Sequence, residues 1–197
     1  PSKKESSTLK GGYEFHEVSD GNATISFCAT RSYYIGGGVY GTQNGFVTAG
    51  HAADTIGART ILNINNDYMG TTRVTYNNQQ VDAAFVETDS DVTLTNDVGA
   101  ISITSTGTRP AGTWVVSYGK NTVSTGQIVK IYASNEFEDE ELNMYNLVEC
   151  DYVAIGGDSG APIMSGSTLL GIHIGGLDAE YYCKISVVQS YLGTTVY

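Results

Sequence analysis

The amino-acid sequence predicts an all-β fold, either a sandwich or a barrel. Short runs that are β-branched or that alternate apolar and polar residues recur along the chain, with Gly, Asn, Asp and Ser between them. Glycine accounts for 24 of the 197 residues and tyrosine for 14, whereas only 16% of the residues are charged. This composition suits short strands and tight turns rather than helix bundles, and 197 residues are enough for one domain or two small subdomains.

The predicted strands cover residues 23–30, 45–49, 60–64, 72–76, 83–87, 113–118, 127–133, 161–164, 169–174 and 181–185. Helical periodicity is found only near the C-terminus, where apolar residues over 187–192 can share one face. The turn-rich segment 104–112 is expected to link two β-rich halves. We therefore predict a flexible lead-in over 1–10, a first half over 11–103, and a second half over 113–197 that includes the helix.

The charge of the chain excludes several classes of partner. Ten basic and 21 acidic residues give a formal net charge of −11 with histidine neutral, which disfavours electrostatic binding to nucleic acid or to anionic membranes. No apolar run approaches the roughly 20 residues that span a bilayer. The chain has neither a His-Glu-x-x-His nor a Cys-x-x-Cys motif, so we predict no metal and no cofactor. Five acids between residues 136 and 141 are interpreted as a solvated loop.

One glycine-rich segment, residues 156–162, places Ser159 between two predicted strands. Glycines on both sides of the serine allow a sharp turn, leave the hydroxyl uncovered and let a substrate carbonyl approach the backbone N–H groups. A Gly-Asp-Ser-Gly surface turn would have the same composition. By itself, the segment leaves a nucleophile and a simple turn both open.

A serine hydroxyl becomes a good nucleophile only when a neighbouring base accepts its proton. Of the three histidines, His51 closes an apolar strand that ends in a glycine turn, which would place the imidazole at the rim of a barrel. His16 lies in a polar stretch and is interpreted as structural. Asp82 stands at the start of an apolar strand and offers a carboxylate that could orient the imidazole.

The candidates follow one another in the order His51, Asp82, Ser159, which is the order of chymotrypsin-type enzymes. Together with Thr-Ala-Gly-His at 48–51 and Gly-Asp-Ser-Gly at 157–160, this order makes the chain resemble the chymotrypsin-like serine protease family. It is most similar to the bacterial streptogrisin, α-lytic and glutamyl endopeptidase branch. The resemblance covers about residues 23–192, and between the motifs only patterns match.

The resemblance implies two antiparallel six-stranded β-barrels with the active site in the cleft between them, and a secreted, monomeric enzyme that acts on proteins or peptides. It assigns Ser159 as the nucleophile, His51 as the base that later protonates the leaving amine, and Asp82 as the group that orients His51. The N–H groups of Gly157 and Ser159 would form the oxyanion hole. Asp158 is usually buried in an ion pair in this family, but its partner is not evident from the sequence.

The resemblance also implies that His173 lies on one wall of the primary specificity pocket. An imidazole there can hydrogen-bond a carboxylate or an amide, so we expect cleavage after Glu, with Gln second. A core histidine bonded to backbone is the alternative. The residues that follow on the same strand, and that are expected to line the pocket, are Ile174, Gly175 and Gly176.

Two further features bear on specificity. Val153 and Ala154, expected at the base of the pocket, supply neither an acid nor a hydroxyl. Glu180 would repel acidic residues and favour Lys or Arg if the strand register places it inside the pocket.

Three alternatives to this reading of the function remain. They are a preference for small apolar residues, esterase activity alone, and a catalytically inactive protease-like binding module.

The three cysteines, Cys28, Cys150 and Cys183, allow at most one disulfide. By the resemblance, Ala52 stands where many relatives carry a cysteine, which leaves Cys28 without that partner. Cys150 and Cys183 could form a bridge or could be free buried thiols.

Overall fold

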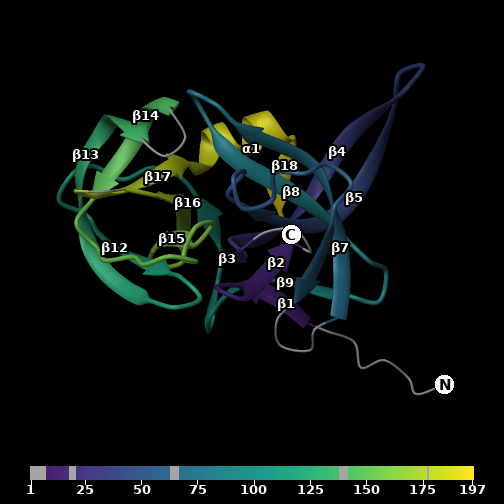
Figure 1. Cartoon of the computed structure of the whole chain (residues 1–197), viewed down its shortest axis with the longest axis horizontal. Helices are drawn as coiled ribbons and strands as arrows, with labels where there is room; N and C mark the ends of the chain where they lie inside the picture. Colours follow the sequence, from purple (N-terminus) through teal and green to yellow (C-terminus); the bar gives the residue numbers. More distant parts are fainter. Residues whose placement is uncertain (1–7, 18–20, 63–66, 138–141, 177) are drawn as a thin grey trace.

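Two strand-rich bodies lie side by side in the computed structural model (Figure 1), which describes residues 8–17, 21–62, 67–137, 142–176 and 178–197. Within these ranges the one helix is α1 (Ile185–Leu192), which contains the predicted helix 187–192. None of the described residues forms a helix that is long and apolar enough to cross a bilayer. Four acids of the predicted acidic loop (138–141) and the end of the predicted strand 60–64 lie outside the described residues.

Most strands of the first body belong to one sheet. Among the described residues its order is β18-β4-β5-β8-β7-β6-β2-β3, and β1, β9 and β10 form a smaller sheet. The strands of the first half of the chain are β1 (Thr8–Gly11), β2 (Glu14–Glu17), β3 (Asn22–Thr24), β4 (Phe27–Gly36), β5 (Val39–Thr48), β6 (Arg59–Leu62), β7 (Asp67–Asn77), β8 (Asp82–Thr88), β9 (Thr93–Val98) and β10 (Ile101–Ser102).

The second body is a sheet whose order, in the described part of the chain, is β11-β16-β15-β12-β13-β14-β17, with β16 also pairing with β17. That extra pairing closes the six strands from β16 to β17 into a ring, and β11 pairs with β16 outside it. Its strands are β11 (Ser105–Thr106), β12 (Trp114–Tyr118), β13 (Val123–Phe137), β14 (Leu142–Cys150), β15 (Pro162–Ser165), β16 (Thr168–Gly175) and β17 (Glu180–Lys184).

Strand β5 and its neighbours decide where the first candidate residues lie. β4 and β5 form a long antiparallel hairpin, and the turn uses Gly36, Gly37 and Gly38 with φ of 126°, 59° and 82°, values that side chains disfavour. β5 then pairs antiparallel with β8 through Thr48 and Ala84. The end of β5 therefore meets the start of β8, which brings the segment after Thr48 next to Asp82.

Each body has its own apolar core, and a third apolar cluster connects them. Phe27 and Phe85 from the first body, Leu169 and Ile172 from the second, and Val188 of α1 belong to this shared cluster. Helix α1 packs against β8, β16 and β17. A continuous apolar core therefore joins the two bodies.

The chain crosses between the two bodies at its C-terminus. After α1, strand β18 (Thr194–Val196) pairs with β4 of the first body. The expected division at 104–112 stays a prediction, but residues 194–196 join the first sheet although the predicted second half extends to 197. Residues 8–10 of the predicted lead-in belong to β1, whose pairing with β9 is parallel.

Candidate active site

His51 and Asp82 are held together by two contacts at the rim of the first body. The backbone N–H of His51 donates to Asp82 Oδ1 at 2.8 Å, and His51 Nδ1 lies 2.6 Å from Asp82 Oδ2. The Asp82 side chain is buried, whereas 28% of the His51 side chain is exposed. A carboxylate on Nδ1 favours the tautomer that carries its proton there, which leaves Nε2 as the basic nitrogen.

The segment that holds Ser159 approaches the His51 segment from the second body. A Cβ built on Gly160 would lie 2.3 Å from Thr48 Oγ1 and 3.1 Å from the backbone N of Ala49, so these two segments are in van der Waals contact. The N–H of Thr24 in the first body also donates to the carbonyl of Ser159 at 2.9 Å. The three residues that the sequence singled out therefore lie on adjoining segments in the structure.

Some of the backbone N–H groups around Ser159 are hydrogen-bonded within the protein and others are not. Asp158 N–H donates to Ile155 O at 3.0 Å, Gly160 N–H to His173 O at 2.8 Å and Ala161 N–H to Asp158 O at 2.8 Å. Within the described ranges, the N–H groups of Gly157 and Ser159 have no protein acceptor. Half-buried backbone donors rarely stay unpaired unless a ligand or water uses them, so this turn offers two donors to an incoming oxygen atom.

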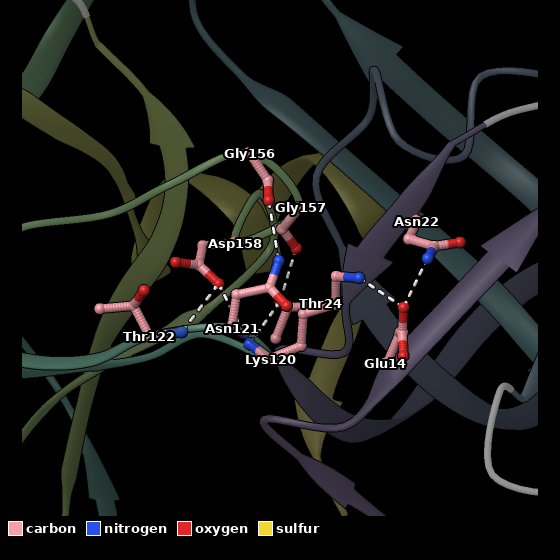
Figure 2. Close-up of polar contacts among 9 residues, drawn as sticks. All are labelled: Glu14, Asn22, Thr24, Lys120, Asn121, Thr122, Gly156, Gly157 and Asp158. Atoms are coloured by element: carbon pink, nitrogen blue, oxygen red, sulfur yellow. Dashed lines mark hydrogen bonds and ion pairs between the residues drawn. The ribbon is translucent and has the colours of Figure 1, made fainter.

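Asp158 is fully buried and bonds backbone rather than a cation (Figure 2). Its Oδ1 accepts from the N–H of Asn121 at 2.9 Å and of Thr122 at 3.3 Å, and its Oδ2 accepts from Ile155 N–H at 3.1 Å. No cationic group among the described residues pairs with it. Hydrogen bonds from N–H groups can stabilise a buried carboxylate, and here they fix the turn that precedes Ser159.

His173 lies on β16 and is almost fully buried. The hydroxyl of Tyr152 is 2.9 Å from His173 Nδ1 in a buried contact. Burial lowers the pKa of His173 from 6.5 to about 4, while nearby Asp158 and the carbonyl of Tyr181 act in the opposite direction. The imidazole is therefore neutral at pH 7 and already has polar neighbours inside the protein.

Glu180 approaches His173 from the start of β17. Its Oε2 lies 3.7 Å from His173 Nε2, and its Oε1 accepts from Ala154 N–H at 3.2 Å. Partial burial raises the pKa of Glu180, and the hydrogen bond from Ala154 partly offsets this. A cavity of about 380 Å³ borders Glu180, Val153 and Tyr152. It is also lined by three further acids, Glu149, Asp151 and Asp178, and by no basic residue among those that the structure describes.

The other residues that the sequence predicts to line the pocket differ in their burial. Val153 is largely exposed and Ala154 half-buried, Ile174 is buried in the shared core, and Gly175 ends β16 with Gly176 directly after it. The sequence does not identify Tyr152. A tyrosine beside Asp151 belongs to no motif, and only the fold shows that the chain leads from β14 towards His173.

The three cysteines are free and buried. Of the two alternatives that the sequence left open for Cys150 and Cys183, the structure therefore has the free thiols and not the bridge. Burial raises the pKa of each thiol to about 12. Since the thiolate is the reactive form, these cysteines are inert at neutral pH and play no part in the site.

Comparisons with known proteins concern the family and the fold of the chain. The trypsin family model matches residues 13–191. A Nocardiopsis protease is 25% identical, with a TM-score of 0.80 over 96% of this chain and 99% of that chain. The Cellulomonas bogoriensis chymotrypsin is 22% identical, with a TM-score of 0.79 over 96% and 98%.

A third solved structure is described as a glutamic acid-specific serine protease that uses a histidine triad in substrate binding. It is 22% identical, with a TM-score of 0.81 over 96% of this chain and all of that chain. Comparison with curated proteins gave no match. The structural likeness confirms the predicted all-β fold of two barrels, and the family model, which spans most of the chain, shows that the chain belongs to the trypsin family.

Proposed function

We propose that the protein is a serine endopeptidase in which Ser159, His51 and Asp82 form the catalytic triad. The observation that carries the proposal is the Asp82–His51 pair, 2.6 Å between Oδ2 and Nδ1, next to a serine turn with two unpaired N–H groups. The inactive binding module is disfavoured because each of these parts is present. Secretion, a monomeric state and the absence of nucleic-acid or membrane partners stay predictions of the sequence.

The proposed reaction runs through an acyl-enzyme. Ser159 Oγ attacks the scissile carbonyl carbon while its proton passes to His51 Nε2, and the carbonyl oxygen, now negative, accepts hydrogen bonds from Gly157 and Ser159 N–H. His51 then gives the proton to the leaving nitrogen as the C–N bond breaks. Water repeats the sequence on the ester and releases the acid. Asp82 supports the charge that His51 carries in both steps.

Labelling with a fluorophosphonate tests the assignment of the nucleophile. We expect one adduct on Ser159, found by peptide mapping, and complete loss of labelling in the Ser159→Ala variant. The His51→Ala variant should hydrolyse peptides at least about 10³-fold more slowly because the serine proton has no acceptor. Labelling that persists in Ser159→Ala would refute the triad.

The residue preferred before the cleaved bond is proposed to depend on the His173–Glu180 pair. Cleavage after Glu, the preference predicted first, is supported by one similar structure described as glutamic acid-specific. Three observations favour the second candidate, Lys or Arg. His173 is buried, which lowers the pKa of its imidazole and disfavours the charged form that would attract a carboxylate. Its Nδ1 is already engaged by Tyr152, and Glu180 would place a like charge next to a glutamate side chain.

A panel of peptides that differ only at the residue before the cleaved bond distinguishes these preferences. We expect Lys or Arg to be cleaved at least about tenfold faster than Glu, and the Glu180→Gln variant to lose most of this preference. Glu87→Gln, which removes an exposed acid paired with Arg73 on the first body, is the matched control. A wild-type preference for Glu that is lost in a His173→Gln variant would instead establish the first candidate.

A further inference from the structure

The loop over residues 119–122, which joins β12 to β13, lies against the glycine turn of the candidate active site (Figure 2). Two backbone N–H groups of this loop bind Asp158, as described above. The side chain of Asn121 makes a separate contact: its Nδ2 donates to the carbonyl of Gly156 at 2.8 Å. The side-chain amide of Asn121 therefore lies next to the N–H group of Gly157, the first of the two unpaired N–H groups.

The contact constrains that N–H group because a peptide unit is planar. The carbonyl of Gly156 and the N–H of Gly157 belong to one trans peptide, so they point in opposite directions. When Asn121 holds the carbonyl on one side, the N–H of Gly157 has to face the other. The peptide joins two glycines and Gly157 has a φ of 93°, so no Cβ on either side hinders its rotation.

The second donor is held by a different part of the chain. Ser159 N–H shares its peptide with the carbonyl of Asp158, which accepts from Ala161 N–H at 2.8 Å within the same turn. The Asp158–Ser159 peptide is therefore fixed by local backbone. The Gly156–Gly157 peptide depends instead on a side chain from another loop, which makes it the weaker point of the site.

We propose that Asn121 is a positioning residue that keeps the Gly156–Gly157 peptide in the orientation in which Gly157 N–H can stabilise the oxyanion. The inference rests on the proposed function and deepens it. Asn121 does not touch the reacting atoms. It acts through the peptide whose carbonyl it binds.

Asn121 is held firmly enough for this role. Its own N–H binds buried Asp158, and the N–H of the preceding Lys120 donates to Thr24 Oγ1 at 3.0 Å. The same Thr24 hydroxyl donates to the carbonyl of Gly157 at 3.0 Å. One buried residue of the first body therefore fixes both the loop and the turn, while the Asn121 side chain itself is exposed and can be changed without disturbing the core.

Two substitutions distinguish a residue that orients the Gly156–Gly157 peptide from one that only holds the two loops together. Asn121→Ala removes the donor, and water can replace it at the exposed carbonyl. Asn121→Asp keeps the shape but points a carboxylate oxygen at the carbonyl of Gly156, which should turn the peptide over. We expect kcat to fall about threefold to tenfold in the first variant and about 100-fold in the second, close to the loss of one oxyanion donor. KM should change less than about twofold because ground-state binding is retained.

Asn96→Asp is the matched control. Asn96 Nδ2 also donates to a backbone carbonyl, that of Ile103 at 3.1 Å, but from β9, outside the turn and the loop that contacts it. The same chemical change there should leave kcat and KM within about twofold of the wild type. Kinetics should use peptide nitroanilides with the residue that the panel selects, and thermal unfolding should be measured for every variant.

Crystal structures of the wild type and the Asn121→Asp variant give a readout that does not depend on activity. We expect the Gly156 carbonyl to be rotated in the variant and the Asp158 contacts to be kept. An unrotated peptide, or a wild-type kcat in Asn121→Asp, would overturn the positioning role. If the wild type shows no Ser159-dependent hydrolysis while the peptide still rotates in the variant, the positioning role stands and the proposed function fails.

Discussion

His173 is buried with a pKa of about 4, so protonating it opposes folding. In the unfolded chain a histidine takes up its proton near pH 6.5. Between pH 6.5 and 4 the unfolded chain therefore binds a proton that the folded protein does not, and the free energy of unfolding falls as the pH is lowered through this window. We expect a loss on the order of 3 kcal/mol, measured by urea unfolding at pH 7 and at pH 4.

Glu180 acts with the opposite sign, since its raised pKa stabilises the fold at low pH and this contribution is lost as the pH rises. The pH dependence of the free energy of unfolding should therefore be compared between two variants: Glu180→Gln alone, and Glu180→Gln combined with His173→Gln. Because all other carboxylates titrate alike in both variants, the difference between their pH profiles isolates His173. If the free energy of unfolding had the same slope between pH 4 and 6.5 in both variants, His173 would take up its proton as readily in the folded protein as in the unfolded chain.

At the level of single residues, the sequence identifies the candidate site residues that stand in short motifs or at the start of a clear strand pattern. His51 and Ser159 stand in such motifs, and Asp82 opens an apolar strand, so residue type and order sufficed to select them. Asn121, Tyr152 and the backbone partners of Asp158 lie in segments without a motif. Their roles arise only because folding brings β12, β13 and β14 against the serine turn, which local sequence does not encode.

At the level of elements, most predicted strands exist, but their bounds follow tertiary pairing. β13 runs for 15 residues where seven were predicted, because β14 pairs along its length with several register shifts. β4 runs past its predicted end and β5 begins before its predicted start, because the glycine turn lets the hairpin continue. β18 has three residues and pairs with a strand far away in the sequence. A pattern of that length carries no signal, and its partner in the first body could not be inferred.

At the level of the whole molecule, a polar connection joins the two bodies beside the candidate active site. Lys120 Nζ of the second body forms an ion pair with Glu14 of β2 in the first, and Glu14 also accepts from Asn22 Nδ2 at 2.6 Å (Figure 2). Only 9% of the Lys120 side chain and 24% of the Glu14 side chain are exposed. Because the same loop carries Asn121, the pair connects the association of the bodies to the geometry of the glycine turn.

Lys120→Met tests this connection, because methionine keeps the apolar stem that packs against Gly157 and removes the charge. We expect the free energy of unfolding to fall by about 1–2 kcal/mol, less than for a fully buried pair since Glu14 keeps contact with water. The double variant Lys120→Met with Glu14→Gln should regain part of this loss, because the carboxylate that Lys120 pairs with is then also neutralised. Urea unfolding of the four proteins gives the coupling energy, and the kcat of Lys120→Met should fall along with the stability. Additive effects, with kcat unchanged, would mean that the ion pair neither holds the bodies together nor supports the turn.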